Sequence, residues 1–198
     1  VIVMALQKYS GLPKNKVIGM AGVLDSSRFK YFLSQVLQVP ISKVDSFVLG
    51  GHGDTMVPVP NRTIVNGEKL NDLMNQGKIS KAKIEEIIDR TRKGGAEVVK
   101  LLETGSAFYG PAASGIEMAD SYLNDKKKVL PCAAYLDGEY DIKDLYVGVP
   151  VIIGSGGIEK VVELNLDDEE QKHFQTSIEA VRESVSYTHL TLPTKSLV

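Results

Sequence analysis

The sequence has one cysteine, no tryptophan and no long apolar run. The single Cys132 excludes a disulfide framework within the chain and fits a reducing compartment, so we expect a cytoplasmic protein. A membrane-spanning helix needs about 20 consecutive apolar residues, and none of the apolar runs approaches that length. We therefore expect no membrane partner.

The sequence also has no excess of charge of either sign. Lys and Arg number 23 and Asp and Glu number 25, which gives a formal net charge of −2. A nucleic-acid-binding surface usually needs an excess of basic residues, so no nucleic-acid partner is expected. With 43% hydrophobic residues, the chain has enough apolar side chains to fold around a core. The chain starts at Val1 without a methionine, so we expect a piece of a longer protein.

The spacing of apolar residues predicts both helices and strands. Helical spacing and stop signals predict helices over 1–9, 29–37, 79–91, 111–123 and 166–185. Short apolar runs bounded by turn residues predict strands over 16–22, 46–49, 63–65, 129–136, 147–153 and 158–164. Gly94 and Gly95 are expected to weaken the third helix, and its apolar pattern then resumes at Val98, Val99 and Leu102 up to Glu103. Helical spacing is lost after Val185. We expect an α+β fold of twisted antiparallel strands with helices.

Among the three histidines, His52 has the most informative position. The strand predicted over 46–49 runs straight into Gly50-Gly51-His52, so His52 lies at the end of that strand with a glycine on each side. Glycines at such a point let the backbone turn sharply and let another molecule approach closely. Two interpretations are open, an ordinary loop histidine or a histidine that transfers protons. His173 is expected on the solvated face of the last helix, and His189 lies in the segment after Val185.

A histidine that transfers protons needs an acid to orient its ring. Asp54 is only two residues away, but such close neighbours in sequence rarely point at each other. Asp25 follows the predicted strand 16–22, and two strands that end at one edge of a sheet would bring it to His52. The alternative role of Asp25 is to cap the helix that follows.

Arg28 comes one helical turn after Asp25, so both side chains share a face. A guanidinium binds a carboxylate through two parallel hydrogen bonds. The alternative is a surface ion pair with Asp25, which contributes little to stability. Together with His52, the two residues predict a site for proton transfer to a substrate that carries a carboxylate.

Other motifs predict no further chemistry. The stretch 154–157 (GSGG) fails the G-x-G-x-x-G pattern because position 159 is Glu, and a strand follows it. We expect a hairpin turn there rather than a phosphate site. No set of His, Cys and acidic residues has metal-ligand spacing, so we expect no metal.

Two motifs in this order resemble the lactate/malate dehydrogenase family. They are 22–29 (GVLDSSRF) and 50–58 (GGHGDTMVP), and the resemblance covers roughly residues 1–185. It is closest to bacterial malate dehydrogenases of the lactate-dehydrogenase-like type, because the GGHGD form and 105–113 (GSAFYGPAA) favour malate over lactate.

The resemblance implies a cofactor, a reaction and a role for each site residue. The cofactor is NAD, and the reaction is reversible hydride transfer between (S)-malate and NAD. His52 accepts the proton of the substrate hydroxyl, Asp25 pairs with His52 and raises its pKa, and Arg28 holds the substrate carboxylate. The implied partners are a dicarboxylate substrate and further copies of the chain, as a homodimer or homotetramer. The alternatives are a dehydrogenase for lactate or another 2-hydroxy acid, and a non-catalytic interaction module.

The resemblance also divides the chain into three segments. Residues 1–24 are expected to be the last helix and strand of an NAD-binding Rossmann domain, and 25–185 the catalytic domain. Residues 186–198 form an unaligned tail, expected to be disordered or foreign. The main NAD site is expected before Val1, so the cofactor-binding residues are unknown and the chain alone is expected to be inactive.

Overall fold

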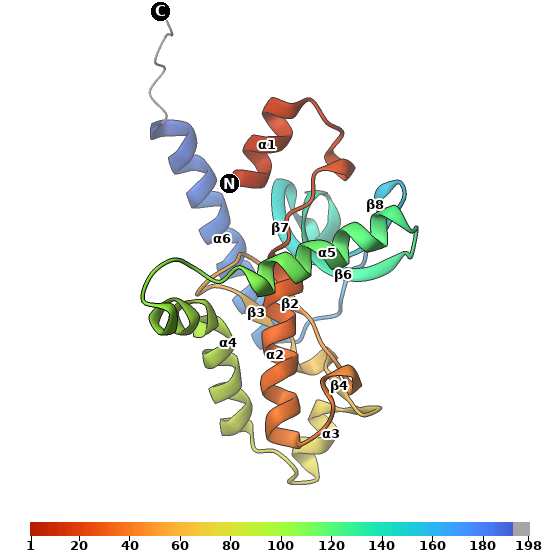
Figure 1. The fold of residues 1–198 in the computed structure, drawn as a ribbon, viewed down its shortest axis with the longest axis vertical. Helices are drawn as coiled ribbons and strands as arrows, with labels where there is room; N and C mark the ends of the chain where they lie inside the picture. Colours follow the sequence, from red (N-terminus) through yellow and green to blue (C-terminus); the bar gives the residue numbers. More distant parts are fainter. Residues whose placement is uncertain (192–198) are drawn as a thin grey trace, which may run out of the picture.

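The structure is a computed structural model that describes residues 1–191, and it mixes helices with antiparallel strands (Figure 1). The helices of that range are α1 (Ile2–Ser10), α2 (Ala21–Leu37), α3 (Leu70–Asn75), α4 (Lys81–Leu102), α5 (Tyr109–Leu123) and α6 (Asp168–Thr191). The strands are β1 (Val44–Asp45), β2 (Val48–Leu49), β3 (Val57–Pro58), β4 (Ile64–Val65), β5 (Glu68–Lys69), β6 (Lys128–Asp137), β7 (Lys143–Gly154) and β8 (Gly157–Val161).

The main sheet is antiparallel, in the order β6-β7-β8. Residues 145–151 of β7 are buried one after another. A strand with one solvated face would alternate between buried and exposed residues, so both faces of β7 are covered here. Phe174 and Ile178 of α6 belong to the hydrophobic cluster around this sheet. The predicted α+β fold is confirmed.

A second hydrophobic cluster lies between α2, α3 and α4, in the lower half of Figure 1. Phe29 and Leu33 of α2 are fully buried there, against Leu70 of α3 and the Ile84 and Ile87 stripe of α4. Burial of each such side chain contributes about 1.5–3 kcal/mol to stability. This cluster fixes α2 and α4 against each other, and both helices contribute to the site described below.

A row of four paired residues crosses the sheet. Gly19 pairs with Ala133 of β6, Ala133 pairs with Gly148 of β7, and Gly148 pairs with Gly50. Hydrogen bonds of 2.8–3.1 Å close both outer pairs. The row anchors the chain just before α2 and the chain just before His52 to the same hairpin, on opposite edges.

The segment before α2 differs from the prediction. The predicted strand 16–22 is not formed, because a short 3₁₀ helix occupies Lys14–Lys16 and α2 already begins at Ala21. Only Gly19 pairs with the sheet. The predicted boundary between residues 24 and 25 lies inside α2.

Two helices continue past points where the sequence predicted weakness or an end. α4 runs without a break through Gly94 and Gly95 to Leu102. α6 extends to Thr191, beyond the end predicted at Val185. The loss of apolar spacing after Val185 did not end this helix, because Pro193, the first residue that would break it, comes later. Residues 192–198 of the predicted tail lie outside the described residues.

Candidate active site

The structure brings the three predicted site residues together. The Nδ1 atom of His52 lies 2.9 Å from Oδ2 of Asp25, and Nη1 of Arg28 lies 3.3 Å from the other oxygen, Oδ1. The Asp25 side chain is 2% exposed and that of Arg28 is 14% exposed, whereas that of His52 is 56% exposed. A buried carboxylate therefore links a guanidinium to an imidazole that remains open to solvent.

Asp25 reaches His52 from within a helix, which corrects the sequence interpretation. It lies in the second turn of α2, where it neither follows a strand nor caps the helix, since Met20 is the N-cap residue. Its neighbour Ser26 accepts a hydrogen bond of 2.8 Å from the backbone N–H of Val48. This bond ties α2 to β2, and β2 runs into the loop that carries His52. Sequence reasoning missed this role of Ser26.

The pairing of Arg28 with Asp25 is not the surface ion pair considered from the sequence. Both side chains are largely buried, so water screens their attraction less than at the surface. Asp54, the other candidate acid, forms no hydrogen bond or ion pair with His52 in the described part of the chain. Of the two candidate acids, Asp25 is therefore the one that orients the His52 ring.

The surroundings of His52 favour its protonated form. The hydrogen bond to Asp25 raises the pKa of His52 above its ordinary value of 6.5, and the negative charge of Asp25 adds to this effect. Partial burial and the positive charge of Arg28 lower the same pKa, but less. The imidazole is therefore placed to take up a proton and hold it.

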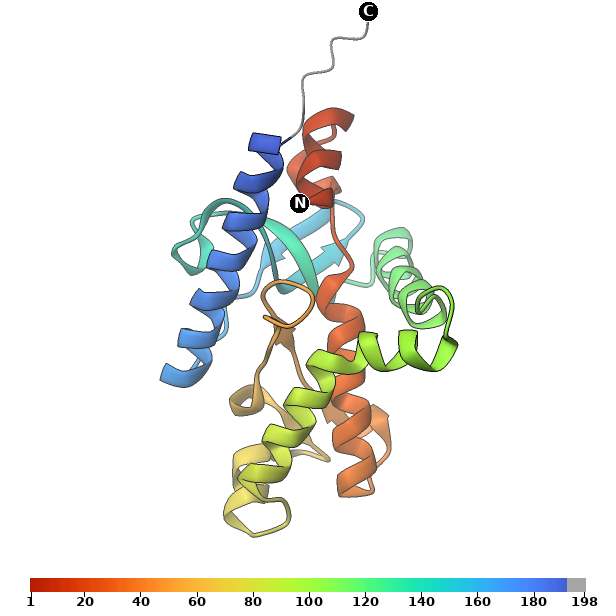
Figure 2. The same ribbon diagram turned by 90° about the vertical axis from the view of Figure 1, so that its left-hand side faces the viewer.

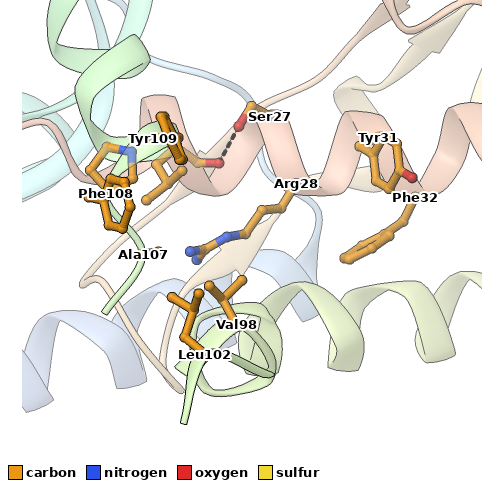
Figure 3. Close-up of a pocket in the computed structure, with 12 residues that line it drawn as sticks. Ser27, Arg28, Tyr31, Phe32, Val98, Leu102, Ala107, Phe108 and Tyr109 are labelled. Atoms are coloured by element: carbon orange, nitrogen blue, oxygen red, sulfur yellow. Dashed lines mark hydrogen bonds between the residues drawn. The ribbon is translucent and has the colours of Figure 1, made fainter. Parts of the chain in front are cut away.

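Arg28 extends into an apolar cavity of about 420 Å³ between α2, α4 and the start of α5 (Figure 3). Figure 3 shows its side chain directed from α2 toward Val98 and Leu102, with Ala107 and Phe108 nearby. A guanidinium in apolar surroundings attracts a small anion more strongly than one in water. The arrangement can hold a carboxylate next to an imidazole that exchanges protons.

Gly94 of α4 provides the space for the Arg28 side chain. A Cβ atom at Gly94 would lie 3.1 Å from Cδ of Arg28, whereas one at Gly95 would lie 3.8 Å from the nearest guanidinium nitrogen. The sequence analysis interpreted this pair of glycines as a weak point of the helix. A glycine inside a helical pattern also indicates close approach of another group, and that signal could have identified Gly94.

Gly94→Ala and Gly95→Ala form a matched pair of substitutions in one helix. Each substitution replaces a glycine inside a helix with alanine, and this change by itself stabilises the fold by about 1 kcal/mol. We expect that gain for Gly95→Ala, but not for Gly94→Ala, because the new methyl group displaces Arg28 from Asp25. Urea unfolding of the two variants and the wild type measures the difference, and equal gains for both would contradict this role of Gly94.

Other candidate sites from the sequence are structural. The stretch Gly154–Gly157 is the turn between β7 and β8, as predicted. Burial raises the pKa of the Cys132 thiol to about 12, so this thiol does not form a reactive thiolate at neutral pH. Among the residues whose side chains the structure describes, no group of three His, Cys, Asp or Glu could hold a metal ion. No helix within residues 1–191 is long and apolar enough to cross a membrane.

The fold and the site define the class of this protein. Residues 22–189 match the family model described as lactate/malate dehydrogenase, alpha/beta C-terminal domain. The chain belongs to the lactate/malate dehydrogenase family.

Within the family, named relatives include both malate and lactate dehydrogenases. The chain is 60% identical over 182 residues to the malate dehydrogenase of Pelagibacter ubique, covering 92% of this chain and 57% of that protein. The crystal structure of Cryptosporidium parvum malate dehydrogenase superposes with a TM-score of 0.93 at 49% identity, over 96% of this chain and 60% of that one.

The lactate dehydrogenase of Cryptosporidium parvum, crystallised with lactic acid and β-nicotinamide adenine dinucleotide, gives a TM-score of 0.94 at 46% identity. That match covers 97% of this chain and 60% of the other. The chain therefore spans about three fifths of the length of these relatives.

Proposed function

We propose that this chain is the catalytic part of an NAD-dependent malate dehydrogenase, which interconverts (S)-malate and oxaloacetate. The observation that carries the proposal is the Asp25–His52 pair beside Arg28, with the Asp25 side chain 2% exposed and the imidazole open to solvent. The 60% identity to a protein named malate dehydrogenase supports malate as the substrate. Lactate or another 2-hydroxy acid is the alternative substrate, because relatives named lactate dehydrogenase share the fold.

Each of the three residues has a distinct role in malate oxidation. Neutral His52 accepts the hydroxyl proton at Nε2, while its Nδ1–H donates to Asp25. The charge of Asp25 stabilises the imidazolium that forms. Arg28 binds a substrate carboxylate and so orients the hydroxyl group toward His52.

NAD, when bound, supplies the acceptor for the hydride that leaves the substrate carbon. Within residues 1–191 no G-x-G-x-x-G turn leads into a helix, so the described residues fit the substrate side of the reaction rather than a dinucleotide. We assign the NAD-binding residues to the part of the relatives that this chain does not span.

The proposed enzyme is a cytoplasmic homodimer or homotetramer. Large apolar side chains on α1 and α5 support association, since Ile2 is 84%, Leu123 75% and Ile116 68% exposed. Exposed apolar surface of this kind is typical of protein interfaces.

The test is a hybrid enzyme in which this chain replaces the matching segment of Pelagibacter ubique malate dehydrogenase. We expect malate-dependent NADH formation, measured by absorbance, because the replaced segment brings its own acid, base and carboxylate-binding residue. A folded hybrid that binds NAD without turnover would favour the non-catalytic interaction module.

A further inference from the structure

Ser177 of α6 lies directly behind the loop that carries His52. Its side chain is fully buried, and its Oγ accepts a hydrogen bond of 2.8 Å from the backbone N–H of Gly51. The same hydroxyl donates a longer bond of 3.4 Å to Oγ1 of Thr55. One side chain therefore contacts the loop on both sides of His52.

The loop lies against α6 too closely to shift without a change at this contact. A Cβ atom at Gly50, whose φ is +82°, would collide with Oγ of Ser177, and one at Gly51 would lie 3.0 Å from Cγ2 of Val181. Figure 2 shows the loop between α6 and α2, with the sheet behind it. The loop is thus enclosed between the helix that carries Ser177 and the helix that carries Asp25.

Other hydrogen bonds hold the backbone of the loop at its two ends. Gly50 pairs with Gly148 at the start of the loop. At its end, the N–H of Met56 bonds to the carbonyl of Gly53, and Nε of Arg92 in α4 donates a bond of 3.1 Å to the carbonyl of Met56. Between these points, the bond from Gly51 to Ser177 connects the residue next to His52 with the body of the protein.

We propose that Ser177 is a positioning residue, whose buried hydroxyl fixes the loop so that the His52 ring meets Asp25. The effect on His52 rests on geometry alone, and only its consequence for turnover rests on the proposed function. Removal of the hydroxyl leaves the Gly51 N–H without this partner in a partly buried place, which costs free energy. The loop then moves to satisfy this group, and the 2.9 Å contact between His52 and Asp25 is lost or lengthened.

The test compares Ser177→Ala with Thr176→Ala in the 198-residue chain. Thr176 is an exposed neighbour on the same helix, whose hydroxyl bonds only to the carbonyl of Lys172. NMR titration of the His52 ring reports its pairing with Asp25. We expect its pKa to fall toward 6.5 in Ser177→Ala and to stay at the wild-type value in Thr176→Ala. Ser177→Cys keeps the volume but offers a weaker acceptor, so the same direction is expected.

A purely structural role would lower the melting temperature and leave the His52 titration of the folded protein unchanged. A wild-type titration in the folded Ser177→Ala or Ser177→Cys variant would therefore overturn the proposal. In the hybrid enzyme, Ser177→Ala should lower kcat about tenfold or more, because small displacements of a catalytic group are costly. If Ser177→Ala shifts the titration while the unmodified hybrid has no turnover, the positioning role stands and the proposed function fails.

Discussion

Replacement of His52 with asparagine should lower kcat for malate oxidation in the hybrid enzyme by about 1,000-fold. Asparagine has a similar shape and can still donate a hydrogen bond to Asp25, but it cannot accept a proton at neutral pH. A positioned acid or base contributes about 10²–10⁴ to the rate. Binding of NAD should be unchanged, because the three site residues face the substrate.

The measurement is steady-state NADH formation, together with a separate titration of NAD binding. His173→Asn is the matched control, because His173 lies exposed on α6. It should retain wild-type turnover. Near-normal turnover of His52→Asn would refute the assignment of His52 as the base. His52 would then be an ordinary loop histidine.

Replacement of Asp25 with asparagine should lower kcat about 100-fold and also shift its dependence on pH. The carboxylate accepts one bond from His52 and one from Arg28, so its loss affects both partners. Without the negative charge, burial and Arg28 remain, and both lower the pKa of His52. The base becomes weaker, and the imidazolium loses its stabilising partner.

The direction of the pH shift follows from the protonation state of His52 that malate oxidation needs. Malate oxidation needs the neutral imidazole, so a lower pKa moves the acidic limb of the kcat/KM profile to lower pH. In the wild type, the folded pKa of His52 is above its ordinary value of 6.5. The pair therefore stabilises the fold fully below pH 6.5, and this contribution is lost as the pH rises through the folded pKa.

In Asp25→Asn, that pH-dependent stabilisation should be absent. The unfolding free energies of wild type and variant can be measured with urea at several pH values. The difference between them should be largest just below pH 6.5. It should fall to a smaller, constant value once the pH exceeds the folded pKa of His52. An acidic limb that stays at the wild-type pH would show that Asp25 does not control the pKa of His52.

The sequence alone was sufficient to predict the meeting of Asp25, Arg28 and His52, but not the way in which they meet. The i,i+3 relation of Asp25 and Arg28 is local, and the structure has that contact. The prediction placed Asp25 at the end of a strand, whereas it lies in α2. Val17 to Met20 are apolar enough for a strand, but a strand depends on pairing along its whole length, and only Gly19 has a partner.

The residues that hold the site residues in place could not be predicted from the local sequence. Ser177 is 126 residues from Gly51, and Gly94 is 66 residues from Arg28. Within the sequence of a helix, a serine that becomes buried, or a glycine followed by another glycine, looks much like an ordinary surface residue. Their roles depend on which elements pack together, and the hydrophobic clusters around α2, α4 and β7 decide that.

The row from Gly19 through Ala133 and Gly148 to Gly50 makes the site sensitive to changes of length. Asp25 follows Gly19 by six residues, and His52 follows Gly50 by two. One residue inserted in either short segment would turn the acid or the base away from its partner. Insertions in the loop between α3 and α4, or in the turn between β6 and β7, would leave both intervals intact. Family members should therefore vary in length in those connections while keeping both intervals constant.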